Sequence, residues 1–293
     1  MKGEKDIMNI KEEFIPLTND LLFKETLSHK DNREALIDFI NSVTNISKKV
    51  IRRNLIVKYE SVLEKSKLSD KNLRGDVIIE CDDYIINLEC YSDFDINSLL
   101  KSTSYIMRIF STQLDRGTPY NNMDNVIQVN IIEKDDTKMM NDFINEFYLT
   151  NKKTNEILFK DKFFIKYYNL EKLRDGSYNE ISDEVKWMKF ISAKTKSDRE
   201  KISRESRVME SMNKWVEEYI NDEKTKKLFG EWSEYIALNK GIKKGLKEGM
   251  EQGKKEGALE KSLEIAKYLK NMNYNIEEII KITKLTKEEI EEL

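Results

Sequence analysis

The chain has 293 residues, of which 36% are charged and 39% hydrophobic, and its formal net charge is -3 with one histidine and two cysteines. About two folded units are expected from this length, and the hydrophobic content excludes a wholly disordered chain. The scarcity of cysteine and histidine excludes a disulfide framework, a structural zinc site and a multi-histidine metal centre. Since no apolar run reaches the roughly 20 residues of a membrane helix, we expect a cytoplasmic protein that makes no membrane contact.

The first half of the sequence alternates between helical and strand-like patterns. Apolar residues recur at helical spacing in the helices, and β-branched and aromatic residues mark the strands. We therefore expect an α/β (α+β) domain over residues 14–180. The predicted elements are a helix over 18–45, strands over 54–63, 75–81 and 84–91, a helix over 97–115, a strand over 125–132 and two or three strands within 143–169.

The second half is helical from about residue 183 onward. We expect a helical region over 181–240 and a glycine-striped helix with a short helical tail over 241–293. Glycine recurs every fourth residue from Gly241 to Gly257, and each glycine costs up to about 1 kcal/mol of helix stability relative to alanine. A stripe of this kind lets another helix approach closely, so we interpret it as a packing or self-association face that could form a homo-oligomer.

A pair of acids on the predicted hairpin is the strongest chemical signal. If the turn is centred on Asp82 and Asp83, cross-strand partners have numbers summing to 165, and Asp76 lies opposite Glu89. Two carboxylates directly opposite each other on neighbouring strands repel unless a cation lies between them. Oxygen ligands of this type suit Mg²⁺ or Mn²⁺. The alternative is that both acids are solvent-facing residues of an ordinary hairpin.

Alternation along the hairpin separates two faces of the predicted sheet. One face is entirely apolar and is expected to be the core, whereas the face that carries the acid pair is mixed. The apolar face consists of Val77, Ile79, Cys81, Ile86, Leu88 and Cys90. The two cysteines lie near opposite ends of the hairpin, so we do not expect a disulfide between them.

The sequence resembles the PD-(D/E)XK nuclease-fold transposase family, the recombination-promoting nucleases of bacteria. Three stretches carry the resemblance: the opening helix with its ND and FK pairs over 17–45, the acid-bearing strands and following helix over 73–113 with their continuation over 117–132, and the glycine-rich tail over 241–293. The resemblance implies a restriction-endonuclease-like core with a mixed central sheet, followed by helices.

Carried over residue by residue, the resemblance implies that Asp76 and Glu89 bind the metal, with the backbone carbonyl of Cys90 as a further ligand. It also implies that Asp20 is the family's N-terminal acidic position. A dipole or capping role for Asp20 at the start of its helix is the alternative.

The third signature position, two residues after Glu89, carries Tyr91 where the family has Lys or Gln. A lysine at this place offsets charge in the transition state, and tyrosine carries no charge. Lys101 or Arg108 on the following helix could supply the missing cation.

These implications predict a Mg²⁺- or Mn²⁺-dependent DNA endonuclease that hydrolyses phosphodiester bonds in DNA recombination. Since the net charge is negative, contact with DNA is expected to be local or brief. The alternative is a catalytically degenerate member of the same fold that acts in DNA binding or protein association, and Tyr91 is the residue that favours it.

Overall fold

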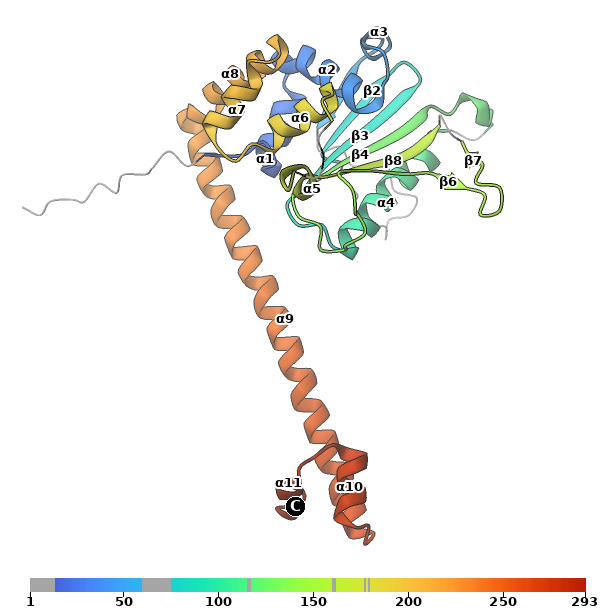
Figure 1. The fold of residues 1–293 in the computed structure, drawn as a ribbon, viewed down its shortest axis with the longest axis vertical. Coiled ribbons are helices and arrows are strands. Elements are labelled where there is room, and N and C mark those ends of the chain that lie inside the picture. Colours follow the sequence, from blue (N-terminus) through green and yellow to red (C-terminus); the bar gives the residue numbers. More distant parts are fainter. Residues whose placement is uncertain (1–13, 60–74, 115–116, 160–161, 177, 179) are drawn as a thin grey trace, which may run out of the picture. The chain divides into compact units, whose positions relative to one another are not determined.

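The computed structural model describes residues 14–59, 75–114, 117–159, 162–176, 178 and 180–293 (Figure 1). The chain forms two compact units, which divide between Ile220 and Asn221. Residues 181–240, expected as one helical region, are therefore distributed over both units.

The first unit is built on a mixed six-stranded sheet. Its strand order is β1-β2-β3-β4-β8-β5; β3, β4 and β8 are parallel, and the outer strands pair antiparallel. The expected α/β class with a mixed central sheet is confirmed. The strands are β1 Ile56–Tyr59, β2 Val77–Cys81, β3 Tyr84–Tyr91, β4 Asn125–Ile132, β5 Ile144–Phe147 and β8 Phe163–Asn169, with a separate pair formed by β6 Leu149–Thr150 and β7 Ile157–Leu158.

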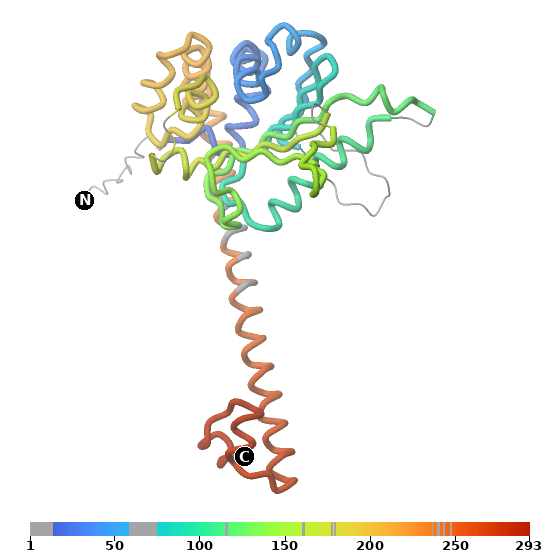
Figure 2. The backbone as a smooth tube through the Cα atoms, turned by 45° about the vertical axis from the view of Figure 1, so that its right-hand side comes forward, coloured from blue at the N-terminus to red at the C-terminus, as the bar shows by residue number. Residues whose placement is uncertain are grey.

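Helices lie on both faces of this sheet (Figure 1). One face is covered by α4, and the other lies beneath α1, α2 and α6. Figure 2 shows that the N-terminal helices lie beside the helices that follow the sheet, although the two sets are far apart in the sequence. The helical elements of this unit are α1 Asp20–Ser28, η1 Lys30–Asn32, α2 Arg33–Thr44, α3 Lys48–Ile51, α4 Ile96–Ser111, η2 Tyr120–Asn122, α5 Leu170–Arg174, α6 Asp183–Ser192, α7 Lys196–Ser203 and α8 Arg207–Asn221.

The hairpin of β2 and β3 has the predicted register. Partner residues sum to 165 from Val77 and Leu88 to Cys81 and Tyr84. Asp82 adopts the left-handed conformation that a two-residue turn requires, with φ 46°, and its carboxylate pairs with Arg53 at 3.0 Å. Both cysteines are free and buried, as expected.

The mixed face of the hairpin is also core, so the expectation of a single buried face was wrong. Ile78 and Tyr91 on that face are 4% and 8% exposed. Helix α4 explains the difference, because Ile106 and Ile109 of this helix belong to the same buried apolar cluster as Tyr91. A sheet with parallel central strands and helices on both sides buries both of its faces.

The other element predictions are confirmed in kind and corrected in detail. The single helix expected over 18–45 is wrong: it is interrupted at His29, whose backbone is extended, with φ −69° and ψ 135°. Asn32 stabilises the break by donating from Nδ2 to the carbonyl of Thr26 at 2.9 Å. Helix α4 ends at Ser111, earlier than expected, and the region 143–169 contains four strands. Residues 60–63 of the predicted second element lie outside the described part of the chain.

The second unit consists of α9 Glu223–Asn271, α10 Ile276–Thr283 and α11 Lys287–Glu291. The predicted short helical tail is formed by α10 and α11. Their small core contains Ala266, Ile279, Leu285 and Ile290. A Cβ atom added at any glycine from Gly241 to Gly257 would meet no atom within 4 Å beyond its own neighbouring residues, so self-association through this stripe stays a prediction. No helix in the described residues is apolar enough over sufficient length to span a membrane.

Candidate functional site

The acid pair lies where β2 begins and β3 ends. The backbone N–H of Asp76 donates to Glu89 Oε1 at 3.0 Å, and the backbone N–H of Cys90 donates to Asp76 Oδ2 at 3.3 Å. Each carboxylate therefore binds the backbone of the opposite strand just beyond the last ladder pair. This reciprocal arrangement brings the two acids together at the open end of the hairpin. Neither acid faces solvent, since Asp76 is 7% exposed and Glu89 is 0% exposed.

Helix α1 supplies a lysine to this pair. Lys24 Nζ lies 3.2 Å from Asp76 Oδ1 and 2.9 Å from Asp20 Oδ1, one helical turn earlier. The N-cap Asn19, which accepts a hydrogen bond from the backbone N–H of Leu22, begins the helix and places Asp20 in its first turn. Lys24 thus joins the predicted N-terminal acid to the predicted metal-binding acid.

Burial dominates the electrostatics of the acid pair. It raises the pKa of Asp76, against the opposing effect of Lys24, and it raises the pKa of Glu89 well above the ordinary value, with the charge of Asp76 adding to the effect. The pKa of Lys24 is raised, because the attraction of Asp76 and Asp20 outweighs the lowering by burial. A cation beside Glu89 would remove the cost of ionising it.

Helix α4 brings a second lysine to the site. Lys101 Nζ lies 5.6 Å from the ring centre of Tyr91 and 5.1 Å from that of Tyr105. Its charge lowers the pKa of Asp76 and of Glu89. The hydroxyl of Tyr91 lies 3.5 Å from Glu89 Oε2, which is the outer limit of a hydrogen bond. The uncharged side chain at the third signature position is therefore adjacent to Glu89 and to a lysine from another element.

The structure brings together Asp20, Asp76, Glu89, Tyr91 and Lys101, all of which were proposed from the sequence. The backbone of Cys90 runs between Glu89 and Tyr91, while its Sγ atom lies on the opposite side of the sheet, 3.6 Å from the carbonyl of Thr18. Arg108 lies two turns beyond Lys101 on α4, about 10 Å further along the helix axis.

Several buried polar residues at the site were missed by the sequence analysis. Lys24 was not assigned to the site. A row of amide and hydroxyl side chains extends from Glu89 beneath α4; it consists of Asn87, Gln128, Asn130, Ser102 and Tyr167, each at most 1% exposed. The signal was present in β4, where Gln128 and Asn130 interrupt an apolar strand at a spacing of two and therefore face the same side.

The residues of the site fit a divalent cation. Among the described residues Glu89 has no ion-pair partner, although its carboxylate is fully buried. When all three acids are ionised, Asp20, Asp76 and Glu89 carry three negative charges against the two positive charges of Lys24 and Lys101, so a bound cation would compensate the remaining negative charge. The part of the chain that the structure describes contains no cluster of three or more acidic, cysteine or histidine ligands. Two carboxylates with water and a backbone carbonyl are a donor set that Mg²⁺ accepts.

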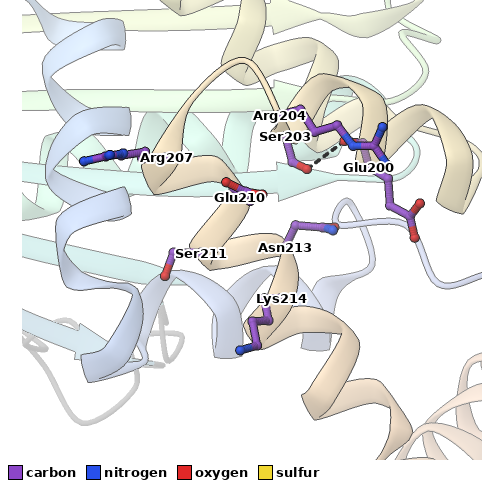
Figure 3. A pocket seen from close by; sticks show the side chains of 8 residues that line it. All are labelled: Glu200, Ser203, Arg204, Arg207, Glu210, Ser211, Asn213 and Lys214. Carbon is purple, nitrogen blue, oxygen red and sulfur yellow. Dashed lines mark hydrogen bonds between the residues drawn. The ribbon is translucent and has the colours of Figure 1, made fainter.

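Two hollows lie elsewhere on the first unit. A groove of about 760 Å³ lies over β1, β2 and the end of α4; its charged lining residues are Glu80, Asp82, Asp124 and Lys58, so it is too acidic to attract a phosphate backbone. A pocket of about 690 Å³ is lined by residues of α7, α8 and the turn between them, including Arg204, Arg207 and Lys214 beside Glu200 and Glu210 (Figure 3). Neither hollow includes a member of the acid pair.

Comparison with known families agrees with this geometry. The sequence model of the PD-(D/E)XK nuclease family transposases matches residues 17–244. The matched region begins just before α1, includes the complete sheet and both acids, and ends within α9. No curated protein matches the chain.

Proposed function

Since the chain belongs to the PD-(D/E)XK nuclease family transposases, we propose that it is a Mg²⁺- or Mn²⁺-dependent DNA endonuclease. The reaction would be hydrolysis of a phosphodiester bond in DNA. We further propose that it acts on DNA in the bacterial cytoplasm during recombination.

The observation that carries this proposal is the buried and undercompensated acid pair. Asp76 and Glu89 share one end of the hairpin, and burial raises the pKa of both. Burying carboxylates without a full complement of positive charge is costly. A cation-binding role therefore explains this acid pair better than a contribution to stability does. Such perturbed groups concentrate at functional sites.

In the proposed mechanism Asp76 and Glu89 hold the ion, with the backbone carbonyl of Cys90 as a third protein ligand. When bound, the ion supplies a Lewis acid for the phosphate and lowers the pKa of water. Lys101 offsets negative charge that develops on the phosphate, in place of the lysine that position 91 lacks. The hydroxyl of Tyr91 donates a hydrogen bond to the neighbouring carboxylate of Glu89.

Asp20 has an indirect role in this proposal. Its carboxylate holds the ammonium of Lys24 at 2.9 Å, and the same ammonium holds Asp76 at 3.2 Å. Asp20 therefore positions Lys24, and Lys24 positions Asp76. This arrangement explains why an acid on the first helix bears on a site on the sheet.

The test is cleavage of supercoiled plasmid DNA by the full chain with Mg²⁺ or Mn²⁺. We expect nicking that disappears with a chelator and in Asp76→Asn and Glu89→Gln. Glu80→Gln is the matched control, because Glu80 is also an acid of β2 but its partner is Lys58, away from the acid pair. Equal nicking by wild type and both acid variants would refute the proposal.

A degenerate nuclease fold that binds DNA or protein without cutting is the second candidate. Tyr91 in place of the charged signature residue favours it, and so does the ammonium of Lys24 on Asp76. This candidate predicts a DNA mobility shift that does not depend on metal and no nicking by the wild type. Tyr91→Lys would then introduce a charge at the signature position, and metal-dependent nicking gained in that variant would identify the missing group.

A further inference from the structure

The row of polar side chains beneath α4 forms one continuous hydrogen-bonded chain that ends on Glu89. Asn87 Nδ2 lies 3.3 Å from Glu89 Oε1 and 3.3 Å from Gln128 Oε1. Gln128 Nε2 lies 3.0 Å from Asn130 Oδ1 and 2.8 Å from Ser102 Oγ. The chain therefore crosses from β3 to β4 and reaches α4.

The direction of the donors in this chain is fixed by a backbone carbonyl. The carbonyl of Lys166 can only accept, so Asn130 presents its Nδ2 group there, at 3.4 Å. Asn130 Oδ1 must then face the donors of Gln128 and Ser102. Gln128, with its Nε2 group used in this way, turns its Oε1 atom toward Asn87.

Asn87 is consequently held with its amide group toward Glu89. Both amide hydrogens are used, one on Glu89 and one on Gln128, whereas Asn87 Oδ1 is buried with no partner among the described residues. The space on that side is tight, because a Cβ atom at Gly75 would come within 2.8 Å of Asn87 Oδ1. Asn87 therefore leaves its Oδ1 acceptor unsatisfied while its Nδ2 donor is placed on the carboxylate of Glu89.

We propose that Asn87 is a positioning residue for the divalent cation, held by Gln128 and Asn130, and that it orients the carboxylate of Glu89 for binding. This inference rests on the proposed function. Residues that hydrogen-bond a metal ligand determine its orientation, and their loss commonly weakens metal binding about 10–100-fold. A row of five buried polar side chains is a costly way to fill a core that apolar residues could fill, unless the row sets the geometry of the site.

Mn²⁺ binding to the full chain, measured by isothermal titration calorimetry and electron paramagnetic resonance, tests this role without a cleavage reaction. Asn87→Leu keeps the shape and removes the donor to Glu89, and we expect at least about tenfold weaker binding. Gln128→Met keeps Asn87 but removes its second anchor, and we expect a smaller loss of affinity in the same direction. If Asn87→Leu does not fold, Gln128→Met and Ser102→Ala test the same chain.

Val129→Ala is the matched control, since Val129 is a fully buried neighbour on β4 that faces the other side of the sheet. It should lower stability and leave Mn²⁺ affinity unchanged. Wild-type affinity in every folded variant of the chain would overturn the inference while leaving the proposed function in place. If the wild type binds no Mn²⁺, or if Asp76→Asn binds Mn²⁺ as tightly as the wild type does, both the inference and the proposed function are overturned.

Discussion

Replacing Lys24 by methionine separates the energetic role of this lysine from that of a bound metal. The variant keeps the aliphatic stem and leaves Asp76 buried without its ammonium. Removing one partner of a fully buried ion pair costs about 3–5 kcal/mol. The side chains of Lys24 and Asp76 are each 10% exposed, so we expect a cost below that range, about 2–3 kcal/mol. The half-exposed pair with Asp20 adds only a few tenths of a kcal/mol.

The same variant should bind a divalent cation more tightly than the wild type. Even with the full screening of bulk water across roughly 6 Å, a unit charge and a divalent ion interact by about 1.4 kcal/mol, so we expect an increase in affinity of at least about tenfold at this buried site. At saturating Mn²⁺ the difference in unfolding free energy between Lys24→Met and wild type should therefore narrow by at least about 1.4 kcal/mol. Urea denaturation with and without Mn²⁺ measures both quantities.

Lys166 provides the matched control for this experiment. It is also a buried lysine, it pairs with Glu184 at 2.6 Å and Glu146 at 3.1 Å, and it contacts α2 through the carbonyl of Val43, away from the acid pair. Lys166→Met should be destabilised to a similar extent, with no recovery in Mn²⁺. If both variants respond to Mn²⁺ alike, or if Lys24→Met does not respond, the assignment of the cation to Asp76 is refuted.

Three further predictions concern the scaffold. The pKa of Glu133 is lowered, because hydrogen bonds from groups such as Lys194 and Arg174 outweigh the raising effect of burial. The contribution of the Glu133 carboxylate to stability is therefore complete above the ordinary glutamate pKa and disappears as the pH falls through the lowered pKa. Urea titrations at neutral and acidic pH should therefore show less loss of stability on acidification in Glu133→Gln than in wild type, and equal slopes would contradict the prediction. Trp187 is 0% exposed between α2 and α6, so Trp187→Ala should lose about 3–5 kcal/mol in chemical denaturation, whereas a loss below 1 kcal/mol would contradict this packing. Ile279→Ala should increase hydrogen exchange in α10 and α11 and leave the sheet of the first unit protected; exposure of the sheet would contradict the division into two units.

The elements of the sheet were predictable because their signals are local. The alternation in β2 and β3 fixes which residues face each other once the turn is placed, so the position of Asp76 opposite Glu89 followed from the sequence. The break at His29 was not predictable, since no proline or glycine marks it and the extended backbone is held by the side chain of Asn32.

The rest of the site depends on how distant elements pack. Lys24 faces solvent or Asp20 in an isolated helix, and only the packing of α1 against the sheet brings it to Asp76. The burial of Asn87 and Glu89 likewise depends on α4, which no local pattern in β3 reveals. Lys101 was identified through the family resemblance, and its role at the site stays a proposal.

The reciprocal backbone bonds of Asp76 and Glu89 have a consequence for genetics. Because each acid fastens the opposite strand, truncating either one loosens the place where the other sits. Single and double replacements should therefore show strong epistasis, with the double variant scarcely worse than either single one. A variant that shortens one acid would remove its charge and also loosen the hairpin, so the two effects could not be told apart. The isosteric replacements Asp76→Asn and Glu89→Gln keep the shape of the side chain and remove the charge.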